Sequence, residues 1–229
     1  MSRKAFFRPL LGLLGLLACA ALLPACRPNG GAESAADKPL PMLGFPTVLA
    51  PGDTLFPRIP AFSVLDQDSA VVTPATFAGK VYIADFFFAT CPSICPKMQS
   101  QMLRVYEKYK DDPRVGFLSH TIDPEHDTLP VLRDYAQRLG VPTAKQWHFV
   151  TAPRDTIFRL AGQYMVAAER DSTAPGGAVH SGAFVLVDPQ RHVRGQYDGV
   201  NEKEVDRLLE ELPRLLKEMG PAPAATASK

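Results

Sequence analysis

The chain carries the sequence FFFATCPSICP at residues 86–96, where an apolar run leads into two cysteines separated by three residues. Apolar residues spaced for one helical face follow this stretch, so Cys91 and Cys95 stand at the beginning of a predicted helix. Their spacing corresponds to about one helical turn. Two thiols placed in this way can form a disulfide, exchange electrons or bind a soft metal ion.

Composition narrows the class of protein but does not choose among these chemistries. The chain has 229 residues, a formal net charge of +1 and 46% hydrophobic residues, as an ordinary globular protein does. Its length allows one large domain or two small ones. No basic or acidic block is present in the sequence, so we expect no nucleic-acid partner.

Residues 1–26 are typical of an export signal and not of a folded segment. Positive residues precede an apolar run at 10–23, which is too short and too interrupted by Gly and Pro to span a bilayer. The run ends in LPAC at 23–26, which is similar to a bacterial lipobox, so we predict that Cys26 is lipidated; Cys19 is a second candidate. The alternatives are a plain signal peptide or an uncleaved anchor. We therefore expect a protein of the bacterial cell envelope, anchored on the periplasmic side of the membrane.

If residues 1–26 are an export signal, the predicted domain contains two cysteines, Cys91 and Cys95. If Cys19 and Cys26 belong to the export segment, Cys91 and Cys95 have only each other in a compartment that permits disulfides. A purely structural disulfide is disfavoured, because so small a loop contributes only about 2 kcal/mol. Thioredoxin-like reductants typically have two residues between their cysteines, and this chain has three. That departure weakens the redox interpretation without excluding it.

The pattern along the chain predicts a tether at 27–52, a single domain at 53–219 and a disordered tail at 220–229. Predicted strands lie at 61–65, 70–72, 81–88, 115–122, 147–150, 164–168, 184–187 and 193–197. Predicted helices lie at 96–110, from a cap at Asp127 or Thr128 to 138, at 153–162 and at 205–219. Residues 169–179 are predicted to be a surface loop.

This order of elements predicts an α/β, thioredoxin-like fold. We expect a central mixed sheet flanked by helices, with an N-terminal hairpin extension. Asp85, inside a strand buried on both faces, is interpreted as a core carboxylate without an assigned role. The cysteines would lie at the carboxyl end of a central strand, where ligands bind in open α/β sheets.

Among the five histidines, His180 is the best candidate for a third ligand. It follows a Gly-containing loop and directly precedes an apolar strand-like run, so a mobile loop could bring its imidazole to the site. The alternative is an exposed loop histidine. Position alone does not decide between the two.

A family resemblance bears on this choice. The chain resembles the Sco/SenC proteins, which are copper-binding, thioredoxin-like assembly factors of cytochrome c oxidase. The resemblance rests on FFFATCPSICP at 86–96, TIDPEHDT at 121–128, LRDYA at 132–136 followed by Trp147, and VHSGAF at 179–184 followed by VDP at 187–189. It implies that Cys91, Cys95 and His180 bind copper, as Cu(I) or Cu(II), and that Asp123 lies near the site. The alternative for Asp123 is a turn-forming residue before Pro124.

The resemblance implies a membrane-tethered copper chaperone. Its copper recipient would be cytochrome c oxidase, and we expect the CuA centre of subunit II; a thiol reductant would keep Cys91 and Cys95 reduced. The alternative is an enzyme, a thiol-disulfide oxidoreductase that reduces cysteines of the oxidase or of other exported proteins. A copper or redox sensor would share the same site. A peroxidase is disfavoured, because no arginine-supported peroxidatic motif surrounds Cys91.

Overall fold

The computed structural model describes residues 38–141, 143–174 and 177–220. The predicted export segment, with Cys26, and the predicted tail beyond residue 220 lie outside these residues. Within them, no helix is long and apolar enough to cross a membrane.

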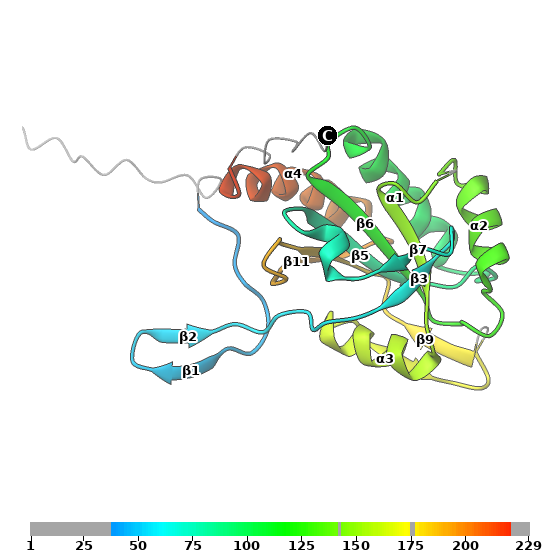
Figure 1. The fold of residues 1–229 in the computed structure, drawn as a ribbon, viewed down its shortest axis with the longest axis horizontal. Coiled ribbons are helices and arrows are strands. Elements are labelled where there is room, and N and C mark those ends of the chain that lie inside the picture. Colours follow the sequence, from blue (N-terminus) through cyan, green and yellow to red (C-terminus); the bar gives the residue numbers. More distant parts are fainter. Residues whose placement is uncertain (1–37, 142, 175–176, 221–229) are drawn as a thin grey trace, which may run out of the picture.

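A seven-stranded mixed sheet forms the centre of the domain, in the order β11-β10-β5-β6-β7-β3-β4 (Figure 1). Its strands are β3 (Val64–Asp66), β4 (Val71–Val72), β5 (Val81–Phe87), β6 (Val115–Thr121), β7 (Trp147–Thr151), β10 (Ala183–Val187) and β11 (Val193–Asp198). β5, β6 and β7 are parallel, whereas β10 pairs with β5 and β3 pairs with β7 in the antiparallel sense. The predicted mixed sheet is confirmed.

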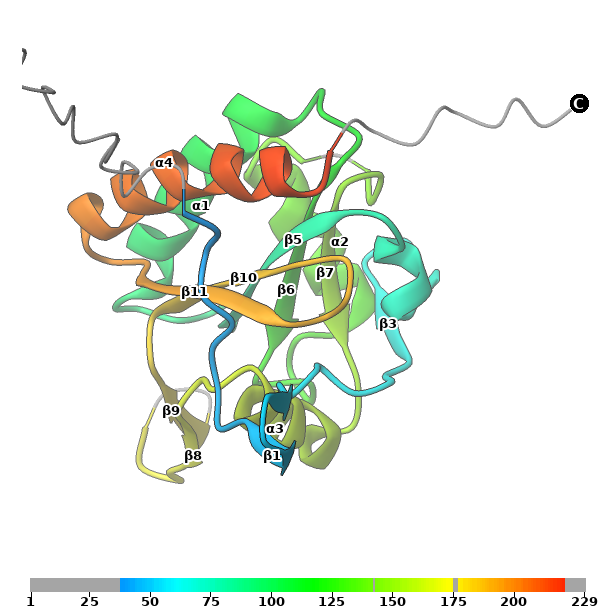
Figure 2. The ribbon, with the colours of Figure 1, turned by 90° about the vertical axis from the view of Figure 1, so that its left-hand side faces the viewer.

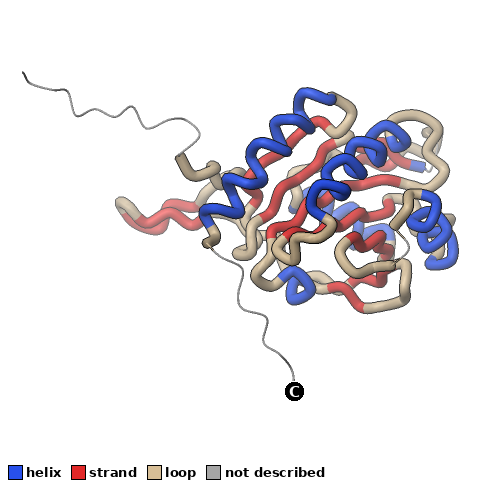
Figure 3. Tube along the Cα trace, turned by 90° about the horizontal axis from the view of Figure 1, so that it is seen from above, coloured by secondary structure: helices blue, strands red, loops and turns tan. Residues whose placement is uncertain are grey.

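Helices cover both faces of this sheet: α1 (Cys95–Tyr109), α2 (Leu129–Arg138), α3 (Arg154–Gln163) and α4 (Glu202–Glu218), with a short 3-10 helix η1 (Pro74–Phe77). Figure 2 places α1 and α4 on the opposite side of the sheet from α3, and in Figure 3 helices lie side by side above the strands. The predicted apolar face of α1 is buried, as expected.

Alternation along β5 determines which side chains meet which helices. The hydroxyl of Tyr82 shares a hydrogen bond of 3.0 Å with the hydroxyl of Tyr164, at the end of α3. Asp85 lies on the other face, where Gln99 of α1 donates to its carboxyl at 2.8 Å. Since every residue of β5 is buried, both helical layers pack on this strand.

The structure corrects the prediction for residues 164–179. Tyr164 ends α3 and Met165 has a φ of 59°, so the chain turns there instead of continuing as a strand. A small separate sheet follows, with β8 (Ala168–Arg170) antiparallel to β9 (Ala178–His180). The predicted surface loop at 169–179 therefore contains parts of both strands, and β9 ends at His180.

The N-terminal region also differs from the prediction. The expected hairpin extension is present, as β3 and β4. The part of the predicted tether that the structure describes is not a free chain, because Leu40 is 5% exposed and its N–H donates to Glu218. A further hairpin, β1 (Thr47–Ala50) with β2 (Asp53–Leu55), projects from the domain (Figure 1).

Candidate metal centre

The loop between β5 and α1 holds both cysteines. Cys91 N–H donates to the carbonyl of Phe88 at 3.2 Å, and Cys95 begins α1 with Pro96 in its first turn. Pro is tolerated there because the first helical N–H groups have no intrahelical acceptor. No side chain caps this helix, so its N-terminal N–H groups and dipole face the cysteine loop and favour negative charge on sulfur.

The two thiols are free and differ in environment. Cys91 is 9% exposed and Cys95 is 1% exposed. Partial burial acts to raise the pKa of Cys91, but hydrogen bonds from the Cys95 thiol and from the Ser93 backbone outweigh it and lower that pKa. Burial, together with the hydrogen bond to Cys91, raises the pKa of Cys95. Cys91 is thus the more reactive sulfur, and Cys95 remains protonated beneath it.

His180 stands next to the buried cysteine. Its Nε2 is 3.7 Å from Cys95 Sγ, and its ring meets the Phe88 ring edge-on at 6.4 Å between centroids. Nδ1 donates to the carbonyl of Ser181 at 3.0 Å, and burial lowers the pKa of the imidazole. The neutral ring therefore carries its proton on Nδ1, so the Nε2 lone pair points to the cysteine.

This arrangement brings together the residues that the sequence indicated. Two thiols and one imidazole form a donor set suited to copper or zinc, and the backbone acceptor on Nδ1 orients the imidazole as metal-binding histidines require. Among the described residues, no three His, Cys, Asp or Glu side chains have the mutual spacing of an assembled metal site. The three groups are therefore neighbours whose side chains must move closer to share one ion.

The other four histidines have partners elsewhere. They are His120, buried and stacked on Phe86 at 4.7 Å between centroids; His126, beside Asp123; His148, beside Asp66; and His192, which accepts from Arg58. His180 alone of the five contacts a cysteine of the pair among the contacts of the described residues.

Asp123 has other partners than the sulfurs. It is 1% exposed, and its carboxylate accepts from Arg154 Nη2 at 2.9 Å and lies 2.9 Å from His126 Nδ1. Its predicted role beside the metal ligands stays a prediction. The carboxyl that reaches the cysteine loop is Asp127, whose Oδ2 accepts from Ala89 N–H at 3.0 Å.

Asp127 was missed as a site residue because its spacing before a helix suggested only a cap. It is fully buried, Thr121 Oγ1 donates to it at 2.5 Å, and burial raises its pKa. Its second oxygen is buried without a hydrogen-bond partner in the described part of the chain. Asp127 therefore ties the end of β6 to the loop that leads to Cys91.

Asp85 is the other carboxyl without an assigned role in the sequence prediction. It is fully buried, it accepts from Gln99 Nε2 and from Ser119 Oγ, and burial raises its pKa to about 7. Gln99 lies one helical turn after Cys95. A carboxyl that is half protonated near neutral pH thus lies under the first two turns of α1.

Comparison with known proteins identifies the family. The SCO1/SenC family model matches residues 55–217. The chain is 27% identical over 162 residues to an SCO1 protein homolog from Bacillus subtilis, covering 70% of this chain and 83% of that protein. It is 28% identical over 172 residues to a candidate copper-binding protein from Stutzerimonas stutzeri, covering 71% and 80%.

Solved structures agree on the fold. A SCO1/SenC family lipoprotein from Bacillus anthracis superposes with a TM-score of 0.63 at 23% identity, covering 69% of this chain and 95% of that one. BsSco, described with a disulfide switch and as a member of the Sco family of cytochrome c oxidase assembly proteins, gives 0.61 at 25% identity, covering 70% and 94%. With its fold, its cysteine pair and a family match over most of its length, the chain belongs to the SCO1/SenC family.

Proposed function

We propose that this protein is a membrane-tethered copper chaperone that binds one copper ion through Cys91, Cys95 and His180. The observation that carries the proposal is the 3.7 Å contact between Cys95 Sγ and His180 Nε2, which joins residues 85 positions apart in sequence. The relative described as copper-binding supports the choice of metal. Thiolates suit Cu(I), and an imidazole nitrogen helps to accommodate Cu(II).

The environments of the three groups suggest an order of engagement. Cys91 is the more exposed sulfur and has the lowered pKa, so it meets the incoming ion first. Cys95 must lose its proton before it binds, because the thiolate is the ligand. His180 needs no proton loss, since its proton lies on Nδ1 and its Nε2 carries none. Copper affinity is therefore expected to rise with pH, as the bound protons leave.

The recipient is proposed to be cytochrome c oxidase, with the CuA centre of subunit II as the specific site. BsSco is described as belonging to a family of oxidase assembly proteins, which supports this recipient. A site with three protein ligands leaves a position through which the recipient's own ligands can enter. Cys26 is proposed as the lipidated anchor on the periplasmic side, in keeping with the family lipoprotein from Bacillus anthracis.

Metal analysis of the reduced full chain tests the copper site. We expect about one copper per chain, loss of binding in Cys91→Ser and in Cys95→Ser, and weaker binding in His180→Ala. His126→Ala is the matched control, because that imidazole is largely exposed and its hydrogen-bond partner is Asp123 and not a cysteine. Unchanged stoichiometry and affinity in Cys91→Ser would overturn the proposal.

A second candidate is thiol-disulfide exchange, which the asymmetry of the pair favours. Cys91, with the lowered pKa, would attack a disulfide of the partner, and the thiolate of Cys95 would then displace the partner's sulfur from the mixed disulfide. A partner disulfide would be reduced as Cys91 and Cys95 become oxidised, and a thiol reductant would restore them. Here His180→Ala should leave the exchange rate nearly unchanged while it impairs copper transfer. Equal loss in both assays would argue against a separate redox role.

A further inference from the structure

The hairpin formed by β1 and β2 is an apolar projection with no covering layer among the described residues. All seven of its strand residues are exposed. Phe45, at its base, is 97% exposed, and Val48, Leu49 and Leu55 are 69%, 62% and 52% exposed. Figure 1 shows the hairpin standing clear of the sheet and helices. Exposed apolar groups gathered in this way usually mark an interaction surface.

The base of the hairpin is fixed to the domain. Leu43 N–H, before β1, donates to Val193 O at 2.8 Å, and Ile59 N–H, after β2, donates to Arg191 O at 2.8 Å. Both ends of the hairpin are thus hydrogen-bonded to β11 and the turn before it. The projection therefore keeps a defined direction relative to the sheet.

Apolar side chains lie on both faces of the hairpin. Thr47 pairs with Leu55 and Val48 pairs with Thr54, so Val48 and Leu55 point to opposite faces of the hairpin, and Leu49 lies in the bulge between Val48 and Ala50. A protein groove would cover one face only, whereas the acyl region of a bilayer surrounds an inserted hairpin. An isolated two-stranded hairpin is also marginally stable in water, so it gains most from an environment that covers it entirely.

The charge pattern favours the same environment. Asp53, beside the tight turn, is the single charged residue between positions 45 and 56. Gly52, with a φ of 86°, allows that turn. A surface that binds anionic headgroups electrostatically carries Lys and Arg, and this one carries none. Without electrostatic binding to headgroups, the hairpin would contact the membrane by inserting its apolar side chains into the interfacial region.

The position of the hairpin along the chain places it near the proposed anchor. Fully extended, the chain from Cys26 to Lys38 spans at most about 40 Å, and β1 begins nine residues further on. Most of the hairpin also precedes residue 55, where the SCO1/SenC match begins. The hairpin therefore lies on the N-terminal side of the matched stretch, the side on which the proposed anchor also lies.

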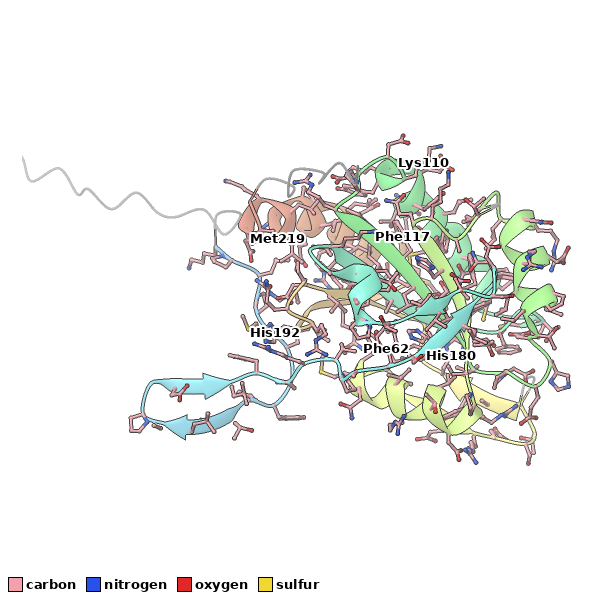
Figure 4. The ribbon with its side chains drawn as sticks, viewed as in Figure 1. Phe62, Lys110, Phe117, His180, His192 and Met219 are labelled. Carbon is pink, nitrogen blue, oxygen red and sulfur yellow. The ribbon has the colours of Figure 1, made fainter. Side chains whose placement is uncertain are left out.

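We infer that the β1–β2 hairpin inserts into the lipid surface and sets the orientation of the domain on the membrane. This rests on the proposed anchoring and adds a second point of attachment. In Figure 4, His180 lies on the body of the domain, well apart from the hairpin. The hairpin can therefore insert while the cysteine–histidine site stays open to a soluble or membrane-bound partner.

Tryptophan fluorescence in vesicles tests the inference, because Trp147 is the chain's single tryptophan and is fully buried. The full chain carrying Val48→Trp is reconstituted into phosphatidylcholine vesicles with ordinary or brominated acyl chains. We expect a blue shift and a large loss of emission in the brominated vesicles. The control is Lys110→Trp, on the far side of the body in Figure 4, which should show no loss beyond that of the unmodified chain.

A second pair of variants tests whether the apolar hairpin is the cause. Leu49→Asp in the Val48→Trp chain should remove most of the quenching, whereas Val71→Asp, which alters another exposed valine on β4, should not. Quenching at position 48 no greater than at position 110, in vesicles that retain the protein, overturns the inference and leaves the anchor intact. If the chain does not float with the vesicles, both the insertion of the hairpin and the proposed anchor are overturned. The proposed copper site is tested independently, by metal analysis of the same chain. Hairpin-dependent dimers or protein complexes without lipid contact would also overturn the insertion of the hairpin.

Discussion

Replacing Asp85 by Asn should change how the stability of the domain depends on pH. The carboxyl is fully buried beneath α1, and burial raises its pKa from 3.8 to about 7. The folded chain thus holds this proton more tightly than the unfolded chain does. The stabilisation is complete below about pH 4, decreases as the pH rises, and is lost above about pH 7.

The magnitude follows from the size of the shift. One pKa unit corresponds to 1.36 kcal/mol, so a shift of about three units makes the wild-type chain lose about 4 kcal/mol of unfolding free energy between pH 4 and pH 7 through this group. Asn has nearly the same volume and no charge at any of these pH values. Its amide also offers a donor to Gln99 Oε1, which is buried without a hydrogen-bond partner in the described residues.

Urea unfolding of the reduced protein at several pH values, followed by the fluorescence of buried Trp147, measures the effect. The stability of Asp85→Asn relative to wild type should rise by about 4 kcal/mol from pH 4 to pH 7 and stay level above it. Asp134→Asn, on the exposed surface of α2, is the control and should change by less than about 1 kcal/mol. A flat difference for Asp85→Asn would refute the reasoning, because the carboxyl would then titrate as in the unfolded chain.

Three further substitutions test particular contacts. Asp127→Ala leaves the Ala89 N–H without its acceptor and should destabilise the fold by about 1–3 kcal/mol in urea unfolding, with Asp127→Asn recovering most of the loss; equal losses would contradict this. Arg194→Met removes the guanidinium that pairs with Glu218 and with buried Asp188, and should cost about 3–5 kcal/mol while hydrogen exchange in residues 40–43 accelerates; unchanged protection there would argue against it. Gly199→Ala would place a methyl 2.7 Å from a buried aromatic ring and 2.8 Å from a carbonyl oxygen, and should cost about 1–3 kcal/mol in thermal unfolding.

The central layers of the fold could be predicted because local patterns specify them. The apolar run that forms β5 and the apolar face of α1 are continuous in sequence, and each depends on burial that a single segment reveals. The position of the cysteines at the end of a parallel strand follows from that order. The family match agrees with the predicted thioredoxin-like class.

Long-range contacts account for what could not be predicted. β8 and β9 have three residues each, too few for a periodic pattern, so only their pairing identifies them as strands. Leu40 is held by Arg194 and Glu218, more than 150 residues away in sequence, and no local signal marks it. The sequence around Asp127 predicts a helix cap, and only the structure shows that its carboxyl contacts the cysteine loop.

X-ray absorption at the copper edge of the reduced, copper-loaded full chain tests the central claim most directly, because it counts the ligand atoms. The proposed site predicts two sulfur ligands and one nitrogen ligand in the wild type, loss of the nitrogen in His180→Ala, and an unchanged spectrum in His126→Ala. Copper bound without sulfur ligands, or a His180→Ala spectrum identical to that of the wild type, would contradict the assignment of Cys91, Cys95 and His180.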